Sequence, residues 1–104
     1  MGWNISHGND FFGEERRSYT NVHHLGQQLA HVLTGADWSV VSFLFTRRSG
    51  DPFDVDPALA RAVAVVLHRG SEHKKMPREW AREANAFALA AGRAAEANEP
   101  WVWR

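Results

Sequence analysis

The run at residues 38–46, WSVVSFLFT, constrains the fold of this chain more than any other stretch. It is rich in β-branched and aromatic residues, which favour β-strands. Both sets of alternating side chains are mostly apolar, which is typical of a strand covered on both faces. We therefore predict a central strand at 38–46, and the rest of the chain must supply the elements that pair with it and cover it.

A second strand and a connecting helix are predicted upstream of this run. Residues 2–7 alternate between apolar and polar side chains, which indicates a short strand. Apolar residues then recur at helical spacing between Thr20, a suitable N-cap, and Gly35, a suitable C-terminal stop. A strand, a helix and a strand of this combined length are typical of a right-handed crossover, so we expect 2–7 and 38–46 to be parallel neighbours.

The second half of the chain predicts two helices and a final strand. Asp56 is placed to cap a helix that carries Pro57 at its first position and ends near Gly70. A long alanine-rich helix follows from Pro77 to about Asn98.

Residues 101–104 are expected to form a strand antiparallel to the first one, with Trp101 or Trp103 against Trp3. The expected fold is thus a single α/β (or α+β) domain over residues 1–104. Its order is β-α-β-α-α-β, with a three-stranded mixed sheet and three helices.

Composition excludes several functional classes. The chain has no cysteine, which excludes disulfides, thiolate metal sites and cysteine nucleophiles. Twelve basic residues balance twelve acidic ones, so no net charge attracts nucleic acid or an anionic membrane. The first residues lack the basic and apolar regions of a secretory signal, and no apolar run is long enough to cross a bilayer. We therefore expect a cytoplasmic protein with no membrane partner.

A long polar connection after the first strand is the candidate site. Ligands bind beyond the carboxyl ends of parallel strands, and two such ends would meet here. Paired arginines suit phosphate or carboxylate groups. The residues expected to gather at this edge and bind a small anionic ligand are His7, Asn9, Asp10, Arg16, Arg17, Tyr19, Arg47 and Arg48. In the alternative interpretation, Phe11 and Phe12 pack under the sheet as a plug and the charged residues form a solvated tip; both remain open.

Metal and nucleophile chemistry find little support in the sequence. His24 and His31 are two helical turns apart, about 10 Å, which is too far to share an ion. Ser6 and His7 are adjacent on a strand, so their side chains leave opposite faces and form no catalytic pair. We therefore predict no metal and no cofactor, with His7 as the only candidate catalytic residue, acting as a general base.

Two surfaces suggest macromolecular partners. Residues 61–82 are the most basic stretch, and we expect them to form a solvated face rather than a nucleic-acid site. Ala84, Ala88 and Gly92 recur every four residues on the last helix, and Leu89 projects elsewhere from it. Together with the tryptophans at the chain ends, they leave a homodimer open as an option.

The opening segments GWNISHG and FFGEERRSY resemble the start of a family of short uncharacterised proteins from high-GC bacteria and their phages. The resemblance covers mainly the first third of the chain and implies no activity.

Three functions follow as hypotheses. The leading one is a non-enzymatic binding or regulatory domain for a protein partner or a small anionic ligand. The second is a small enzyme acting on a phosphorylated or carboxylated metabolite, with His7 as the base. The third is a nucleic-acid accessory protein that uses residues 61–82.

Overall fold

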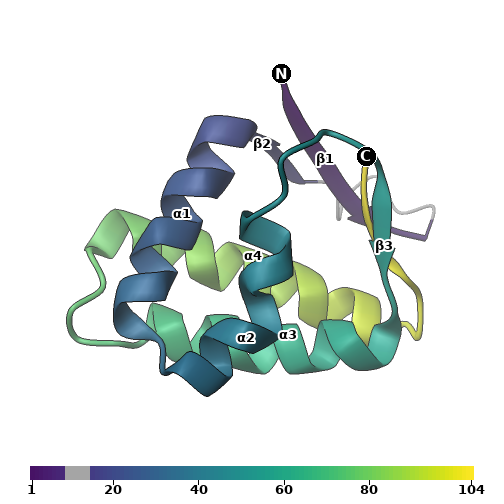
Figure 1. Cartoon of the computed structure of the whole chain (residues 1–104). Helices are drawn as coiled ribbons and strands as arrows, with labels where there is room; N and C mark the ends of the chain where they lie inside the picture. The colour runs from purple at the N-terminus through teal and green to yellow at the C-terminus, as the bar shows by residue number, and fades with distance from the viewer. Residues whose placement is uncertain (9–14) are drawn as a thin grey trace.

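A computed structural model describes residues 1–8 and 15–104 and shows a small mixed domain (Figure 1). Strands and helices alternate irregularly along the chain. The elements in order are β1 (Gly2–His7), β2 (Glu15–Ser18), α1 (Tyr19–Val32), α2 (Gly35–Phe45), β3 (Phe53–Val55), α3 (Pro57–Ser71), α4 (Arg78–Glu96) and β4 (Trp101–Trp103).

The four strands form one sheet in the order β2-β1-β4-β3, and every neighbouring pair is antiparallel. The predicted three-stranded mixed sheet with three helices is therefore wrong, although a small single α/β domain is confirmed. The predicted pairing of the first and last strands is also confirmed. Trp3 and Trp103 meet edge to face with their ring centroids 5.7 Å apart.

The predicted central strand at 38–46 is wrong, because these residues form most of α2. Thr34 caps the helix by accepting a hydrogen bond from the backbone N–H of Asp37 at 3.1 Å. Val41 and Leu44 are buried one turn apart on the same helical face. A run that is apolar on every side has no clear period, so burial in the helical layer decides between strand and helix.

Two edge strands escaped prediction for different reasons. Strand β2 has the sequence ERRS, whose charges suit an edge exposed to water. Strand β3 is only three residues long and lies in a segment rich in turn residues. Its Asp54 forms a salt bridge at 3.0 Å with Arg104, which follows the neighbouring strand β4. This edge of the sheet therefore carries charge too.

Helix starts follow their capping residues. Asp56 accepts a hydrogen bond from the Leu59 N–H at 2.9 Å, with Pro57 at the start of α3, as predicted. Helix α1 starts earlier than predicted, because Ser18 rather than Thr20 provides the cap.

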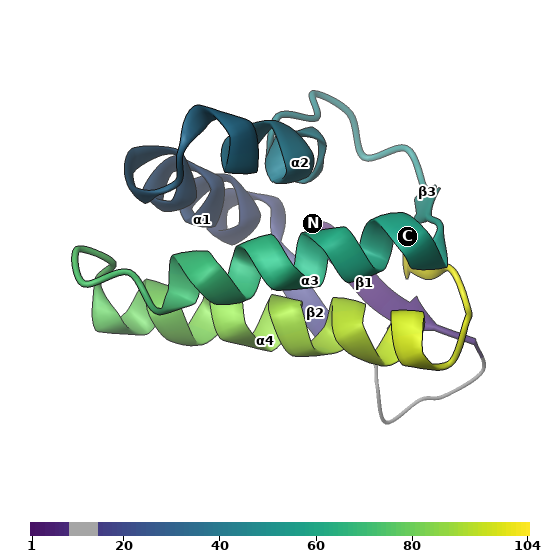
Figure 2. The same ribbon diagram turned by 90° about the horizontal axis from the view of Figure 1, so that it is seen from below.

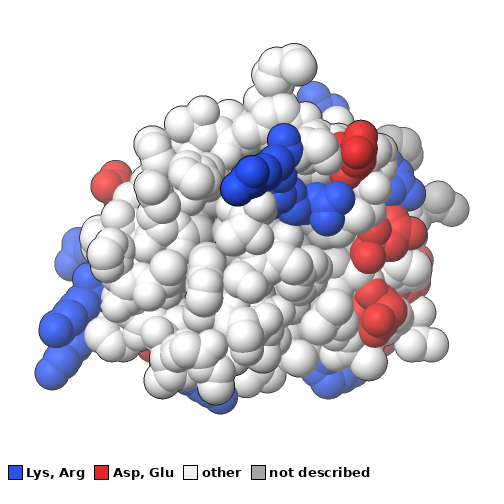
Figure 3. Space-filling view, in the orientation of Figure 1, with Lys and Arg blue, Asp and Glu red and all other residues white. Residues whose placement is uncertain are grey.

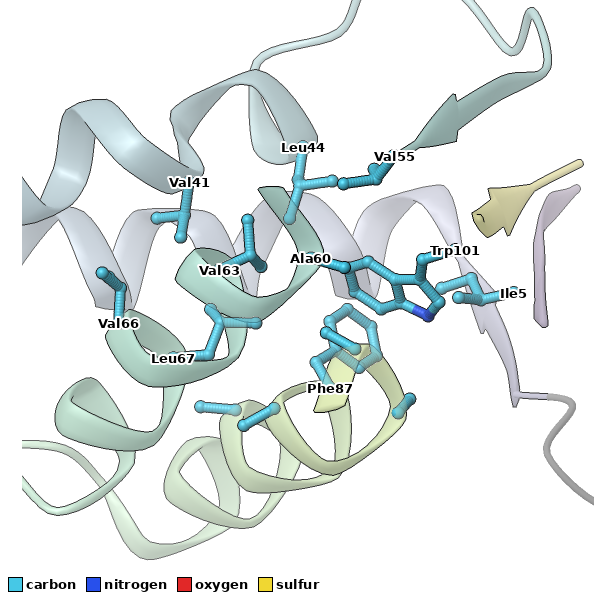
Figure 4. Close-up of a cluster of buried hydrophobic side chains, with 14 of the residues drawn as sticks. Ile5, Val41, Leu44, Val55, Ala60, Val63, Val66, Leu67, Phe87 and Trp101 are labelled. Carbon is cyan, nitrogen blue, oxygen red and sulfur yellow. The ribbon is translucent and has the colours of Figure 1, made fainter. Parts of the chain in front are cut away.

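The helices cover one face of the sheet and enclose the core. Inward side chains of β1 and β4, such as Ile5 and Trp101, meet Phe87 of α4 and the apolar faces of α2 and α3 (Figure 4). Helices α3 and α4 lie side by side along most of their length (Figure 2). The opposite sheet face carries exposed polar residues such as Asn4 and Arg16. None of the helices in the described part of the chain is long and apolar enough to span a membrane.

Candidate functional site

The predicted rim of two parallel strand ends does not exist, because residues 38–46 are helical and every strand pair is antiparallel. The predicted site residues therefore divide among several places. Asn9 and Asp10 lie outside the described residues, as do Phe11 and Phe12 of the predicted plug.

Three of the predicted residues, Tyr19, Arg47 and Arg48, line one pocket of about 200 Å³. The pocket lies where the start of α1, the end of α2 and the following loop meet. On the face that shows these elements, basic side chains gather over the segment that leaves α2, on a largely uncharged surface (Figure 3). The other lining residues are Trp3, Val22, His23, Leu44, Phe45, Ser49 and Gly50.

Aromatic rings hold the polar groups of this pocket in place. The Arg47 guanidinium lies over the Phe53 ring, with its Cζ 4.0 Å from the ring centroid. Tyr19 packs edge to face on Trp3, with centroids 5.4 Å apart. Trp3 and Phe53 also contact each other and Trp103, at centroid distances of 5.3 to 5.7 Å. Arg47 and Tyr19 therefore each pack against a cluster of aromatic rings in mutual contact.

Gly50 allows the loop to approach α1. A Cβ atom at this position would collide with the Tyr19 hydroxyl oxygen. The absence of a side chain at residue 50 therefore lets the loop close against the pocket wall.

The charges of Arg47 and Arg48 are not neutralised within the described structure. Neither has a carboxylate in salt-bridge contact among residues 1–8 and 15–104. Five other arginines have a carboxylate oxygen at 2.6 to 3.9 Å, namely Arg17, Arg61, Arg69, Arg93 and Arg104. Asp51 lies close in sequence, and its carboxylate accepts a hydrogen bond from Ser49. The pocket is thus a local concentration of positive charge.

Arg17, another predicted ligand-binding residue, is used within the fold. Its Nε donates to Glu83 on α4 at 2.6 Å, and its Nη1 donates to the Arg16 carbonyl at 2.8 Å. Burial by itself lowers the pKa of Arg17, but the hydrogen bond and charge of Glu83, helped by Glu15, outweigh it and raise that pKa above its usual value. Arg17 therefore ties β2 to α4.

Arg16 and His7 lie in two other hollows. Arg16 lines a shallow surface beside Gly2 and Asn4. His7 is only 6% exposed and lines a broad groove of about 690 Å³ along α3 and α4. The general base and the Arg47–Arg48 pair of the enzyme hypothesis thus line separate hollows.

The described residues offer no metal site, and acidic neighbours lie beside part of the basic stretch 61–82. In that part of the chain, no group of three His, Asp or Glu side chains could hold a metal ion. In the basic stretch 61–82, Arg69 pairs with Asp37 at 2.7 Å and Arg61 lies 3.9 Å from Glu96. Part of its charge is therefore balanced by acidic neighbours.

The sequence interpretation missed Trp3, His23 and Ser49 as pocket residues. A signal for His23 exists, because residues four apart lie on the same helical face and Tyr19 precedes it by one turn. Trp3 was assigned to an aromatic pair with Trp101 or Trp103 and, as an alternative, to a dimer interface, and Ser49 gave no signal apart from following the arginine pair.

Comparison with known proteins places the chain in a family but transfers no activity. No curated protein and no solved structure matches it. One family model, described as a domain of unknown function, matches residues 8–104. The match supports the expected uncharacterised family, although most of GWNISHG precedes the matched residues. The chain therefore belongs to the family described as domain of unknown function DUF7739.

Proposed function

We propose that this chain is a binding domain that recognises a small anionic ligand in the pocket of Tyr19, Arg47 and Arg48. The observation that carries the proposal is an arginine pair without carboxylate partners in the described structure, lining a pocket with hydroxyl groups from Tyr19 and Ser49. Guanidinium groups donate in a fixed, forked geometry that matches phosphate and carboxylate oxygens.

The position of Arg47 over the Phe53 ring supports the proposal of a small anionic ligand. Arg47 is already oriented by the Phe53 ring, so a ligand would have to order fewer side-chain rotamers on binding. No Asp or Glu is among the described residues that line the pocket, and the Asp51 carboxylate beside it accepts a hydrogen bond from the Ser49 hydroxyl. These features favour an anion over a cation.

The volume of the pocket narrows the class of ligand. Sites for drug-sized molecules occupy roughly 300–1,000 Å³. The pocket here is about 200 Å³, which suits inorganic phosphate, a short carboxylic acid or a single phosphorylated group better than a whole nucleotide. A cytoplasmic location for this binding remains a prediction from sequence alone.

Calorimetric titration with inorganic phosphate, followed by short dicarboxylates, tests the proposal. Hydrogen bonds to charged groups contribute about 1.5–3 kcal/mol, so Arg47→Ala and Arg48→Ala should each weaken binding by about tenfold to a hundredfold. Arg78→Ala is the matched control, because it removes an exposed arginine outside the pocket.

The control should bind as the wild type does. Equal losses in Arg78→Ala and Arg47→Ala would show that only the overall charge matters. No heat and no rise in melting temperature with any of these anions would overturn the proposal.

A further inference from the structure

Two features distinguish the groove along α3 and α4. The first is His7, a polar side chain that is only 6% exposed and lines the groove. The second is Gly92, in the interior of α4.

Gly92 is not required by contacts within the described chain. A Cβ atom there would meet only the Cβ of Ala64, at 4.0 Å, which is ordinary packing distance. Alanine is more favourable than glycine in a helix interior. The glycine therefore leaves room on the surface of α4 for a group outside the chain to approach the helix closely.

The same surface carries both projections and recesses. Leu89 and Val65 project from α4 and α3 and are 56% and 52% exposed. The recess between them is lined by small residues, Ala64, Ala88 and Gly92. A surface with matching projections and recesses can pack against a copy of itself around a two-fold axis.

Charged residues on α4 are also placed symmetrically about Leu89. Arg82 precedes Leu89 by seven residues and Glu96 follows it by seven, so all three lie along one face of α4. Two copies of α4 that cross antiparallel near Leu89 would bring Arg82 of each copy to Glu96 of the other. Within the described part of the chain, Arg82 makes no salt bridge, and Glu96 has only a long, exposed contact to Arg61 at 3.9 Å.

We infer that a second copy of this chain docks on the α3–α4 groove, with α4 antiparallel to α4 around a two-fold axis near Leu89. Leu89 of each copy fills the recess at Gly92 of the other. Asn85 of the second copy approaches the end of the groove that contains His7. The inference is independent of the anion pocket, which lies elsewhere on the molecule.

The area of the proposed interface sets the expected affinity of the dimer. Helix α4 has 19 residues and is about 28 Å long, so a face two helices wide buries roughly 600 Å² on each copy. The total of roughly 1,200 Å² lies at the lower end for stable interfaces. We therefore expect a reversible dimer with a dissociation constant in the micromolar range.

Sedimentation equilibrium of the full chain over a concentration series tests this inference. Leu89→Asp should weaken the dimer at least about tenfold, because it places a charge at the centre of an apolar contact. Gln27→Asp adds the same charge at an exposed position on α1 and should leave the dimer unchanged. A wild-type chain that stays monomeric at every concentration would overturn the inference, as would a dimer insensitive to Leu89→Asp.

Charge exchange tests the orientation. Arg82→Glu and Glu96→Arg should each weaken the dimer about five- to tenfold, since each contact occurs twice, and the double variant should recover most of the affinity. Failure of the double variant to recover would overturn the antiparallel arrangement.

Gly92→Ala separates the interface from folding. It should raise the melting temperature of the dilute monomer while weakening the dimer about tenfold. An unchanged or tighter dimer would contradict the close approach at Gly92.

Discussion

The pocket of Tyr19, Arg47 and Arg48 and the α3–α4 groove differ in size and in the groups that line them. The pocket is small and aromatic-walled, and it contains arginine charges that no described carboxylate balances. The groove is about three times larger and open, lined mainly by small apolar residues, with one nearly buried histidine. Concentrated charge in a small pocket suits a small anion, whereas a broad apolar face suits another protein surface. The predictions below test this division, from the largest expected effect to the smallest.

Removing the aromatic support should affect the pocket most strongly. Trp103 is fully buried and contacts Trp3, Phe53 and Phe87. Trp103→Ala should lower the free energy of unfolding by about 3–5 kcal/mol through cavity formation, and phosphate affinity should fall with it. Urea unfolding and phosphate titration at low temperature measure both effects.

Trp103→Phe is the matched control for that variant. The Trp103 indole N–H has no hydrogen-bond partner among the described residues, so its loss should cost little beyond the reduced ring size. If Trp103→Phe were as destabilising as Trp103→Ala, the volume of the aromatic ring would not account for the loss of stability, which would contradict the cavity argument.

Arg17→Met should separate a structural arginine from a binding arginine. Loss of the contact to Glu83 should lower the free energy of unfolding by about 1–2 kcal/mol without changing phosphate affinity. The raised pKa of Arg17 means that its stabilisation is present below the unfolded-state pKa and is lost only as pH rises through the still higher folded-state value. Between about pH 6 and pH 9, Arg17 therefore stays charged and its own titration should not change the effect. Weaker phosphate binding in Arg17→Met would instead place this residue in the site.

Gly50→Ala should weaken the pocket through shape alone. The added methyl group would displace the Tyr19 hydroxyl group, and we expect phosphate affinity to fall about three- to tenfold with a loss of less than about 1 kcal/mol in stability. Gly35→Ala is the control, because nothing lies near a Cβ at that position. Equal binding losses in both variants would argue against a role for the Tyr19 contact.

A change in salt concentration should have the smallest effect of these tests, and the effect should differ between the two surfaces. Raising NaCl from about 0.05 M to about 0.5 M shortens the screening length, so phosphate affinity should fall several-fold. Dimer affinity should fall less than phosphate affinity, because apolar contact contributes most of it and salt screens only the Arg82–Glu96 contacts. Equal salt dependence in calorimetry and in sedimentation would remove the distinction between the surfaces.

Helices with clear ends were predictable from sequence, and short or fully covered elements were not. Asp56 and Pro57 mark the start of α3 by local chemistry that needs no tertiary information. Helix α2 is apolar on nearly every side, so its period was hidden, although Thr34 followed by Asp37 is a readable capping signal. The edge strand β2 is polar and four residues long, and its pairing with β1 depends on contacts that no local pattern encodes.

The candidate site was predicted in part, but through a mistaken arrangement. Tyr19, Arg47 and Arg48 do line one pocket, yet the end of α2 rather than the end of a strand brings the arginines there. His7 was placed with them because parallel strands were assumed. The antiparallel sheet instead directs its side chain into the α3–α4 groove.

The position of β4 inside the sheet has a consequence for biosynthesis. Strand β4 joins β1 to β3, so before residues 101–103 emerge from the ribosome the sheet consists of separated pieces. Helices α3 and α4 contact each other more than any other element, so this hairpin can form earlier, whereas the aromatic cluster must wait for its tryptophans. A nascent chain stalled before residue 101 should therefore expose Trp3 and Phe53 to chaperones.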